Sequence, residues 1–445
     1  MFKNDMYCNP TCQADSDPPP KTSKWSYPDP TPGAPPLAQK GSLFCQYILL
    51  WTNRHTRKYK LVIMKNIDEI LSRYIASGDL PCAVAGVANA DGTLYMGAAG
   101  LRSLDETQAM TTDTIFAIAS MTKAITTVAT LQLVEQGLID LDAPITTYLP
   151  DLDRLKVLSG FDDEGKPMLV SPESIPTTRQ LLTHTSGYVY EIWNANGLKN
   201  VANGNLDSFF TDGGNGMMAP LGFSPGQRWE YGIGIDWAGV VVETLSGKSL
   251  DVYFSDHIFS PLRMQDTFYE VPEEKTARRA AIHSRQVSGL TVIPHLGEPV
   301  SGGGGLSSTI ADYLRFMRAI LNQGTLDGAA ILQPYTVDMM FENNIGDLIV
   351  TPGTTLMPTL SNDFDMGFGT PSKWGLGFLL HQAQTESGRP KGTASWAGLF
   401  NSYFWIDREN DLCAVIGTQV LPFYDTHAIA MLKDFEAAVY ENLNS

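Results

Sequence analysis

Apolar residues follow helix-like or strand-like spacing over most of the chain from about residue 64. In "NIDEILSRYIASG" (66–78) they recur every three or four residues, between a candidate N-cap, Asn66, and Gly78. Two apolar runs then meet at Asp91-Gly92, which is typical of a hairpin turn. The stretch "FAIASMTKAITT" (116–127) begins a mostly apolar segment that predicts a helix ending near Gly137.

The C-terminal part repeats this alternation of helices and strands. "SGGGGLSSTIADYLRFMRAIL" (301–321) predicts a glycine-rich turn followed by an amphipathic helix. "NSYFWIDRENDLCAVIGTQV" (401–420) predicts two strands around the polar turn 408–411, and a last helix is expected from about Thr426 to Asn442. The middle of the chain contains loops and helices rich in Gly, Asn and aromatic residues. We therefore expect an α+β fold, with an antiparallel sheet flanked by helices and a mostly helical insertion.

The first residues have a different composition. Nine of the 27 prolines lie among residues 1–40, which is typical of a segment without a packed core. We expect residues 1–63 to be a proline-rich, disordered extension and residues 64–445 to be the folded part. Within the folded part, the sheet and its helices should come from about 64–135 and 300–445, and the helical part from about 136–299.

The net charge and the cysteine content bear on which partners the protein can bind and on which cellular compartment it occupies. A net charge of −17 disfavours nucleic acids and anionic membranes as partners. The five cysteines show neither a disulfide framework nor metal-site spacing, which favours a reducing compartment. No run approaches the roughly 18 apolar residues of a membrane span, and in "SLFCQYILLW" (42–51) the basic cluster follows the apolar run, the reverse of a secretory signal. We expect a cytoplasmic location; the pattern predicts no particular oligomeric state.

Several common kinds of catalytic site are missing from the sequence. There is no H-E-x-x-H, and the seven histidines do not cluster, so a zinc hydrolase is disfavoured. There is no G-x-S-x-G nucleophile elbow and no Walker A motif. "GIGIDWAG" (232–239) contains only G-x-G of a dinucleotide fingerprint. We therefore expect neither a metal nor a cofactor.

Ser120 and Lys123 form an S-x-x-K pair within the apolar stretch 116–127. Residues i and i+3 share one helix face, so the serine hydroxyl and the lysine amine can meet. A lysine in an apolar wall favours its neutral amine, which can act as a base toward the serine. The alternative is a lysine that reaches solvent from an ordinary helix, because S-x-x-K also occurs by chance. The pair alone leaves both interpretations open.

Two further segments bear on that choice. Tyr231 follows the turn Pro225-Gly226 and precedes an apolar run, where an ordinary core tyrosine is also expected. Trp396-Ala397-Gly398 precedes a predicted strand. Small residues at that point allow a substrate to approach backbone N–H groups at a sheet edge, although an ordinary strand entry has the same pattern.

The order and spacing of S-x-x-K, Tyr231 and W-A-G resemble one family. Further similar segments are "TTRQLLTHTSGY" (177–188), "FSPGQRWEYG" (223–232), "SPLRMQDTFY" (260–269), "SGGGGLSSTIADYLRF" (301–316), "KWGLGF" (373–378) and "SWAGLFNSYFWID" (395–407). The chain resembles serine esterases of the β-lactamase fold, the family VIII carboxylesterases, which are related to class C β-lactamases and penicillin-binding proteins. The likeness covers about residues 64–445.

The resemblance implies a role for each matching residue. Ser120 would be the nucleophile, Lys123 would assist its deprotonation, and Tyr231 would pass a proton between serine, leaving group and water. The backbone N–H groups of Ser120 and Leu399 would form the oxyanion hole.

The same resemblance suggests substrate-binding residues. Trp396 would form a wall of the acyl pocket, Gly398 would allow the substrate close to the backbone, and Tyr190 would line the cleft. His184, in "LTHTSG", lies in a segment that is a structural turn in this family, so we expect no chemistry from it.

The sequence also departs from a β-lactamase. Where those enzymes have K-T-G it has Trp396-Ala397-Gly398, and Lys391-Gly392-Thr393 has the wrong order and position. Where they have Y-x-N it has Tyr231-Gly232-Ile233. A site without these charged and amide groups should favour neutral esters with small, apolar acyl chains. We expect a serine carboxylesterase acting on a small-molecule ester; the alternative is a β-lactamase or DD-peptidase-like hydrolase, or an acyltransferase, that uses the same site.

Overall fold

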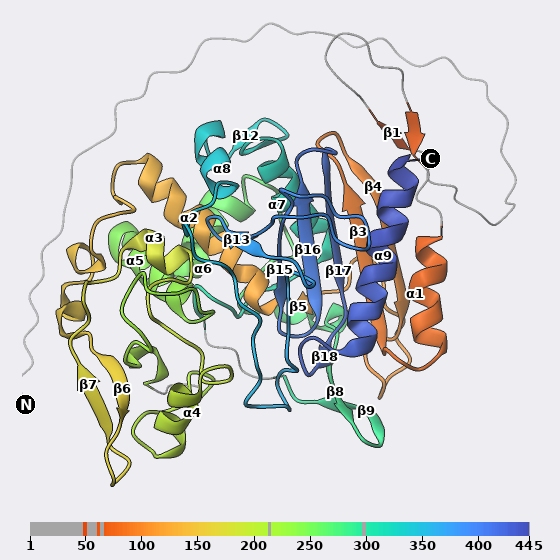
Figure 1. Cartoon of the computed structure of the whole chain (residues 1–445). Coiled ribbons are helices and arrows are strands. Elements are labelled where there is room, and N and C mark those ends of the chain that lie inside the picture. The colour runs from red at the N-terminus through yellow and green to blue at the C-terminus, as the bar shows by residue number, and fades with distance from the viewer. Residues whose placement is uncertain (1–47, 51–59, 63–65, 212–214, 296–299, 445) are drawn as a thin grey trace, which may run out of the picture. The chain divides into compact units, whose positions relative to one another are not determined.

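A seven-stranded sheet forms the centre of the computed structural model, which describes residues 48–50, 60–62, 66–211, 215–295 and 300–444 (Figure 1). Every neighbouring pair of strands is antiparallel. In spatial order the strands are β13 (Ser372–Trp374), β14 (Leu379–His381), β15 (Ala394–Gly398), β16 (Ser402–Asp407), β17 (Leu412–Gly417), β3 (Cys82–Ala88) and β4 (Thr93–Gly100). The expected hairpins at Asp91-Gly92 and at 408–411 are confirmed, as is the antiparallel sheet.

Helices cover both faces of this sheet. Side chains on a strand alternate between its two faces, so each face presents apolar residues to a helix. On β16, Phe404 packs against Tyr313 of α7 (Ile310–Leu321), whereas the next residue, Trp405, packs against Phe435 of α9 (Thr426–Asn444). Helix α1 (Ile67–Ala76) lies beside α9 (Figure 1). The central strands are buried on both faces, which explains their nearly continuous apolar sequence.

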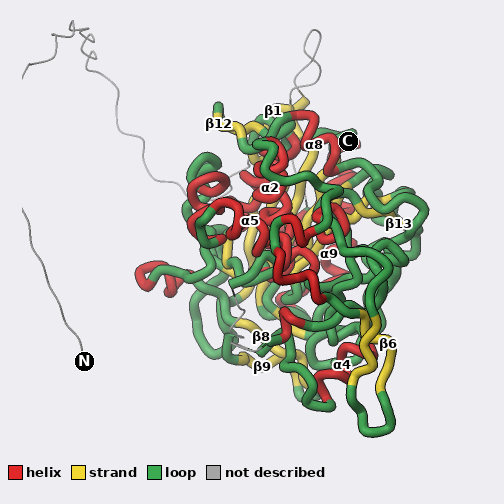
Figure 2. The backbone as a smooth tube through the Cα atoms, turned by 90° about the vertical axis from the view of Figure 1, so that its left-hand side faces the viewer, coloured by secondary structure: helices red, strands yellow, loops and turns green. Residues whose placement is uncertain are grey.

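The helix that contains Lys123 is buried on all sides. A 3₁₀ turn, η1 (Ala119–Met121), leads into α2 (Thr122–Glu135), and every residue of α2 from Thr122 to Leu133 is buried. A helix that is largely apolar all round belongs in the interior. It packs against α5 (Gly234–Ser246), and the two helices lie side by side in both views (Figures 1 and 2). Gly137 follows with φ 71°, the left-handed conformation expected just after a helix end.

The middle of the chain contains more strand than the sequence predicts. Its helices and turns are η2 (Ile145–Thr147), η3 (Pro150–Arg154), α3 (Thr178–Leu182), α4 (Ala195–Ala202), η4 (Gly216–Met218), α5, α6 (Leu250–Phe254), the π-helical turn η5 (Ser255–Phe259) and η6 (Glu273–Arg278). Two hairpins interrupt them: β6 (Val157–Phe161) with β7 (Pro167–Val170), and β8 (Ile282–Gln286) with β9 (Gly289–Ile293). Strand β8 also pairs with β18 (Val420–Leu421), a partner far away in sequence that local patterns do not reveal.

A short strand pair fixes the segment ahead of Ser120. Strand β5 (Phe116–Ala117) pairs with β10 (Ser307–Ser308), and the Ile118 N–H donates to the Leu306 carbonyl at 2.9 Å. The glycine-rich turn at 301–305 is thereby held next to the start of α2. This junction positions the serine.

The remaining elements lie outside the central sheet. They are the pair β11 (Thr325–Leu326) and β12 (Ala329–Ala330), helix α8 (Pro334–Met340), and the pair β1 (Ile48–Leu50) and β2 (Lys60–Val62). The rest of the expected extension, 1–47, 51–59 and 63, lies outside the described residues. Within the part that is described, no helix is both long enough and apolar enough to span a bilayer.

Two predicted helix ends differ in detail. Asn66 precedes α1, but its φ of 67° is left-handed and its side chain does not cap the helix. The last helix begins at Thr426 as expected and extends to Asn444.

Candidate active site

Ser120 lies at the junction of β5 and α2, within η1. The preceding residue, Ala119, has φ 44°, a left-handed conformation that an alanine rarely adopts. Strain of this kind persists only where the surrounding structure enforces it. Here the β5–β10 pair on one side and α2 on the other hold the backbone, and Ser120 is left half-buried at the edge of a cavity.

Lys123 lies one helical turn beyond the serine, and only 1% of its surface is exposed. Its Nζ lies 3.1 Å from Ser120 Oγ, 3.0 Å from Tyr190 Oη and 2.7 Å from the Gly303 carbonyl oxygen. The expected i, i+3 contact is therefore present. A lysine that extends to solvent, the alternative interpretation of the sequence, does not describe this side chain.

Tyr231 comes from the loop ahead of α5, three residues before the helix begins at Gly234. The Lys123 Nζ lies 5.0 Å from the centre of its ring. The Trp396 indole N–H donates to the Tyr231 hydroxyl at 3.4 Å, and the two rings lie 5.0 Å apart. Tyr231 is thus placed between the lysine and the strand that contains W-A-G.

Tyr190 is more closely involved than the sequence suggested. Its hydroxyl contacts the Lys123 amine directly and donates to Asp236 Oδ2 at 3.4 Å. Burial and the nearby Asp236 carboxylate raise the pKa of Tyr190 well above its usual value, which keeps its hydroxyl protonated.

Asp236 is a residue of this site that the sequence motifs do not reveal. It lies in "GIGIDWAG" (232–239), which has only the G-x-G of a dinucleotide motif. The signal that could have revealed it is an acidic residue within an otherwise apolar helical run, since a buried carboxylate requires partners. In the structure it is buried in the first turn of α5.

The W-A-G segment lies directly against the segment ahead of Ser120. A Cβ on Gly398 would stand 2.4 Å from the Ile118 carbonyl oxygen, so only glycine allows this approach. The following residue, Leu399, lines the same cavity as Ser120. The structure therefore brings Gly398 and Leu399 beside the serine; an oxyanion hole built from the Ser120 and Leu399 amides remains a prediction.

His184 packs beneath Tyr231. Its ring lies 4.7 Å from the Tyr231 ring and 4.8 Å from that of Trp374, and its Nδ1 accepts the Gly232 N–H at 3.5 Å. Burial holds the pKa of His184 well below 6.5, so the ring is neutral. These contacts are those of a structural residue.

Two apolar cavities meet at Ser120. They share Ser120, Trp193, Tyr231 and Leu399. The larger, about 60 Å³, is also lined by Ala119, Tyr190, Ile192, Phe209, Phe210, Ser301, Gly303 and Gly304, and the smaller, about 20 Å³, by Phe364, Trp396, Ala397, Gly398 and Phe423. None of these lining residues is charged.

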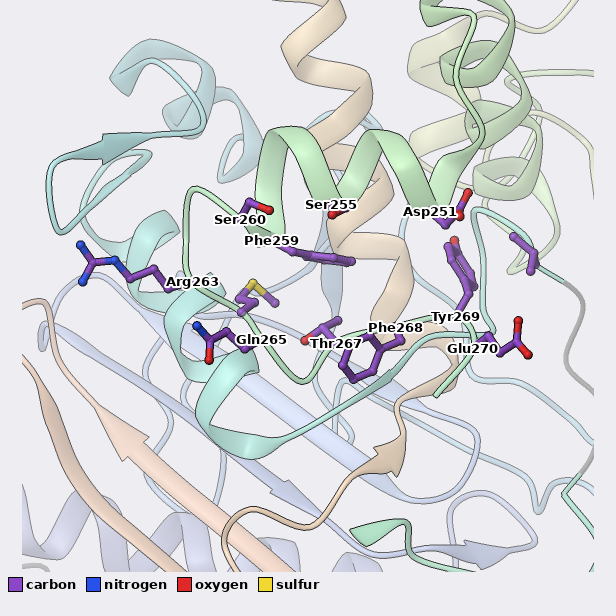
Figure 3. A pocket seen from close by; sticks show the side chains of 12 residues that line it. Asp251, Ser255, Phe259, Ser260, Arg263, Gln265, Thr267, Phe268, Tyr269 and Glu270 are labelled. Atoms are coloured by element: carbon purple, nitrogen blue, oxygen red, sulfur yellow. The ribbon is translucent and has the colours of Figure 1, made fainter. Parts of the chain in front are cut away.

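Wider clefts lie further out. One of about 520 Å³ adjoins the smaller cavity, with which it shares Trp193, Tyr231 and Phe364. Another, of about 810 Å³, does not include Ser120; Figure 3 shows Arg263 and Gln265 at one end of it and Asp251, Tyr269 and Glu270 at the other. Across the described parts of the chain, no three His, Cys, Asp or Glu side chains gather as a metal site.

Comparison with known proteins identifies the family. The family model described as Beta-lactamase matches residues 67–437. The lovastatin esterase of Penicillium rubens is 32% identical over 406 residues, covering 85% of this chain and 99% of that protein. The monacolin J acid methylbutanoyltransferase of Aspergillus terreus is 31% identical, covering 84% of this chain and 95% of its own.

The solved structures agree. A mutant of simvastatin synthase (LovD) from Aspergillus terreus superposes with a TM-score of 0.75 at 30% identity, covering 85% of this chain and 98% of that one. The match of fold and sequence extends through both the sheet and the central insertion. The chain belongs to the beta-lactamase family.

Proposed function

We propose that this protein is a serine carboxylic ester hydrolase that forms an acyl-enzyme on Ser120. The observation that carries the proposal is the 3.1 Å contact between Lys123 Nζ and Ser120 Oγ, within a buried and largely apolar site. The lysine has no carboxylate partner within ion-pair distance among the described residues, so its amine is available to the serine. Similarity to a lovastatin esterase supports the same conclusion.

The first half of the reaction acylates the serine. Lys123 takes the proton of the Ser120 hydroxyl as Oγ bonds to the ester carbonyl carbon, and the carbonyl π pair moves to oxygen. The backbone N–H groups of Ser120 and Leu399 would stabilise that oxyanion. Its collapse breaks the bond to the alcohol, which leaves with a proton relayed from Lys123 through Tyr231.

The second half releases the acid. Water attacks the acyl carbon and gives up a proton through Tyr231 and Lys123; the restored carbonyl expels Ser120, which takes that proton back. Because Trp396 donates to the Tyr231 hydroxyl, the phenol oxygen is held at the junction of the two cavities.

The cavities favour a neutral ester with a small acyl group. Their lining is aromatic and aliphatic, and W-A-G supplies no cation for the carboxylate of a β-lactam or a peptide. We therefore propose that β-lactam hydrolysis is weak compared with ester hydrolysis. Assignment to the family VIII carboxylesterases in particular is part of this proposal.

Acyl transfer is the second candidate, because relatives of about 31% identity are acyltransferases by name. The same acyl-enzyme would be attacked by an alcohol in place of water. One experiment distinguishes the two activities. The protein is acylated with p-nitrophenyl butyrate, and a primary alcohol is then added at increasing concentrations as a competing acyl acceptor. A constant yield of butyric acid supports hydrolysis, whereas conversion to the new ester at millimolar alcohol supports transfer.

The site itself is tested by labelling. A fluorophosphonate probe should modify Ser120, mapped by mass spectrometry, and Ser120→Ala should remove both labelling and ester hydrolysis. Ester hydrolysis retained by Ser120→Ala would overturn the assignment.

A further inference from the structure

Asp236 is a buried acidic residue that forms hydrogen bonds to Tyr190 and Gly303, the two residues that contact Lys123 besides Ser120. Only 1% of its surface is exposed, and no Lys, Arg or His nitrogen among the described residues lies within 4.0 Å of its oxygens. Its Oδ1 accepts from Ser301 Oγ at 2.6 Å and from the Gly303 N–H at 2.9 Å. Its Oδ2 accepts from the Tyr190 hydroxyl at 3.4 Å. A buried polar group requires such partners.

These contacts fix the direction of the hydrogen bonds. The Tyr190 hydroxyl donates to Asp236 Oδ2, so its proton points at the carboxyl group. The Tyr190 oxygen then faces Lys123 as an acceptor. The Gly303 carbonyl, the other close neighbour of the amine, is an acceptor as well.

The arrangement determines where the lone pair of Lys123 points. A neutral amine has two N–H bonds and one lone pair, and the Lys123 Nζ has three neighbours at hydrogen-bond distance. When Tyr190 and Gly303 both accept, the two N–H bonds are used. The lone pair is left for the third neighbour, the hydroxyl of Ser120.

We propose that Asp236 is a positioning residue that orients the hydrogen bonds of Tyr190 and Gly303 so that the Lys123 lone pair faces Ser120. This inference rests on the proposed function, in which Lys123 is the base. Asp236 acts through Tyr190 and Gly303; it contacts neither Ser120 nor Lys123.

Close packing supports the role. A Cβ on Gly303 would stand 2.3 Å from Asp236 Oδ2, so only glycine lets the turn approach the carboxyl group this closely. The Ser301 carbonyl is held in turn by the Tyr269 hydroxyl at 2.7 Å. Tyr269 also lines the wide cleft of Figure 3, and the turn is held by hydrogen bonds to both Asp236 and Tyr269.

The test is Asp236→Asn, which keeps the size of the side chain and adds an N–H donor. An amide N–H aimed at Tyr190 would turn its proton toward Lys123 and draw the lone pair away from Ser120. Stopped-flow acylation by p-nitrophenyl butyrate should slow about 100-fold, in the range of a lost general base, with little change in the substrate concentration at half-saturation.

Asp312→Asn is the matched control. Asp312 is also buried in the first turn of a helix and accepts from the Asp266 N–H at 2.7 Å and from Thr267 Oγ1 at 3.0 Å, but it belongs to α7 and does not line the cavities at Ser120. This variant should acylate at the wild-type rate. A general sensitivity to buried Asp→Asn changes would slow both variants equally and would contradict the proposal.

A double-mutant cycle with Tyr190→Phe tests whether Asp236 acts through the Tyr190 hydroxyl. Phenylalanine removes the hydroxyl that Asp236 orients, so Asp236→Asn should slow acylation much less in that background than in the wild type. Full additivity of the two effects, or wild-type acylation by Asp236→Asn, would overturn the proposal. Activity of Ser120→Ala would instead overturn the proposed function, so the two failures are distinguishable.

Discussion

Gly398 lies so close to Ile118 that a Cβ on the glycine would stand 2.4 Å from the Ile118 carbonyl oxygen. We predict that Gly398→Ala pushes β15 away from the start of α2. Overpacking of this kind costs about 1–3 kcal/mol of unfolding free energy, and misplacing the Leu399 amide should lower ester hydrolysis at least about tenfold. Gly92→Ala is the control, since a Cβ there meets nothing within 4 Å. Urea denaturation and p-nitrophenyl butyrate kinetics measure both effects; equal behaviour of the two variants would contradict the prediction.

The base is tested most cleanly by Lys123→Met, which keeps an apolar chain of similar length in the buried site. We expect the rate of ester hydrolysis to fall about 10²–10⁴-fold because Ser120 loses its proton acceptor. Lys248→Ala removes an exposed lysine, paired with Asp256 at 2.7 Å, and should leave the rate unchanged. The readout is kcat/KM together with the circular dichroism spectrum. A folded Lys123→Met variant with wild-type kcat/KM would exclude the lysine as base.

Tyr231→Phe removes the hydroxyl proposed to relay protons while keeping the ring that packs on Trp396. We predict a loss of about 10²-fold or more in kcat. Tyr188→Phe is the matched control, because the buried Tyr188 hydroxyl has no hydrogen-bond partner among the described residues, and its removal should retain activity and stability. Steady-state kinetics on p-nitrophenyl butyrate compares the two. A larger loss of kcat from Tyr188→Phe than from Tyr231→Phe would contradict the role of Tyr231 as the proton relay.

The proximity of Ser120 and Lys123 could be predicted because it is local: residues three apart share one helix face. The pair alone leaves a solvent-exposed lysine open, and the family resemblance favours the contact. The hairpin at Asp91-Gly92 was predictable because it too is local. By contrast, strand β8 depends on a parallel pairing with β18 across 137 residues, from His283 to Val420, so the sequence around β8 alone does not indicate a strand partner.

Asp236 shows the same limit within the site. Its partners are Tyr190, 46 residues earlier, and Ser301 and Gly303, more than 60 residues later. The order of the motifs singles out Tyr231 and Gly398 only through the family resemblance, which implies roles for them. No motif names the acidic residue that holds the lysine's other partners, and only the folded arrangement reveals it.

A buried ion pair joins α9 to the segment after β14. Arg389 and Glu436 are in direct contact, with 2% and 1% of their side chains exposed. Glu436→Gln should lower the unfolding free energy by about 3–5 kcal/mol, because it leaves the guanidinium buried without its counter-charge. Lys248→Ala breaks an exposed pair and should cost less than about 1 kcal/mol. Urea denaturation at neutral pH measures both; a Glu436→Gln effect as small as that of Lys248→Ala would contradict the prediction.

Acid should destabilise the protein before its carboxylates titrate. Burial lowers the pKa of His184, His283, His295 and His381 below 6.5, that of His295 to about 4. The unfolded chain therefore binds protons below pH 6.5 that the folded chain does not, so this contribution to stability is full above pH 6.5 and falls as the pH falls. Each histidine contributes at most about 1.4 kcal/mol per pH unit. Urea denaturation at pH 7.5, 6.5 and 5.5 should show this decline in unfolding free energy. His184→Phe places a ring that does not titrate beneath Tyr231. This variant should reduce the slope of unfolding free energy against pH by the equivalent of up to one bound proton. Stability that rises from pH 7.5 to 5.5 would show that these rings are charged in the folded protein.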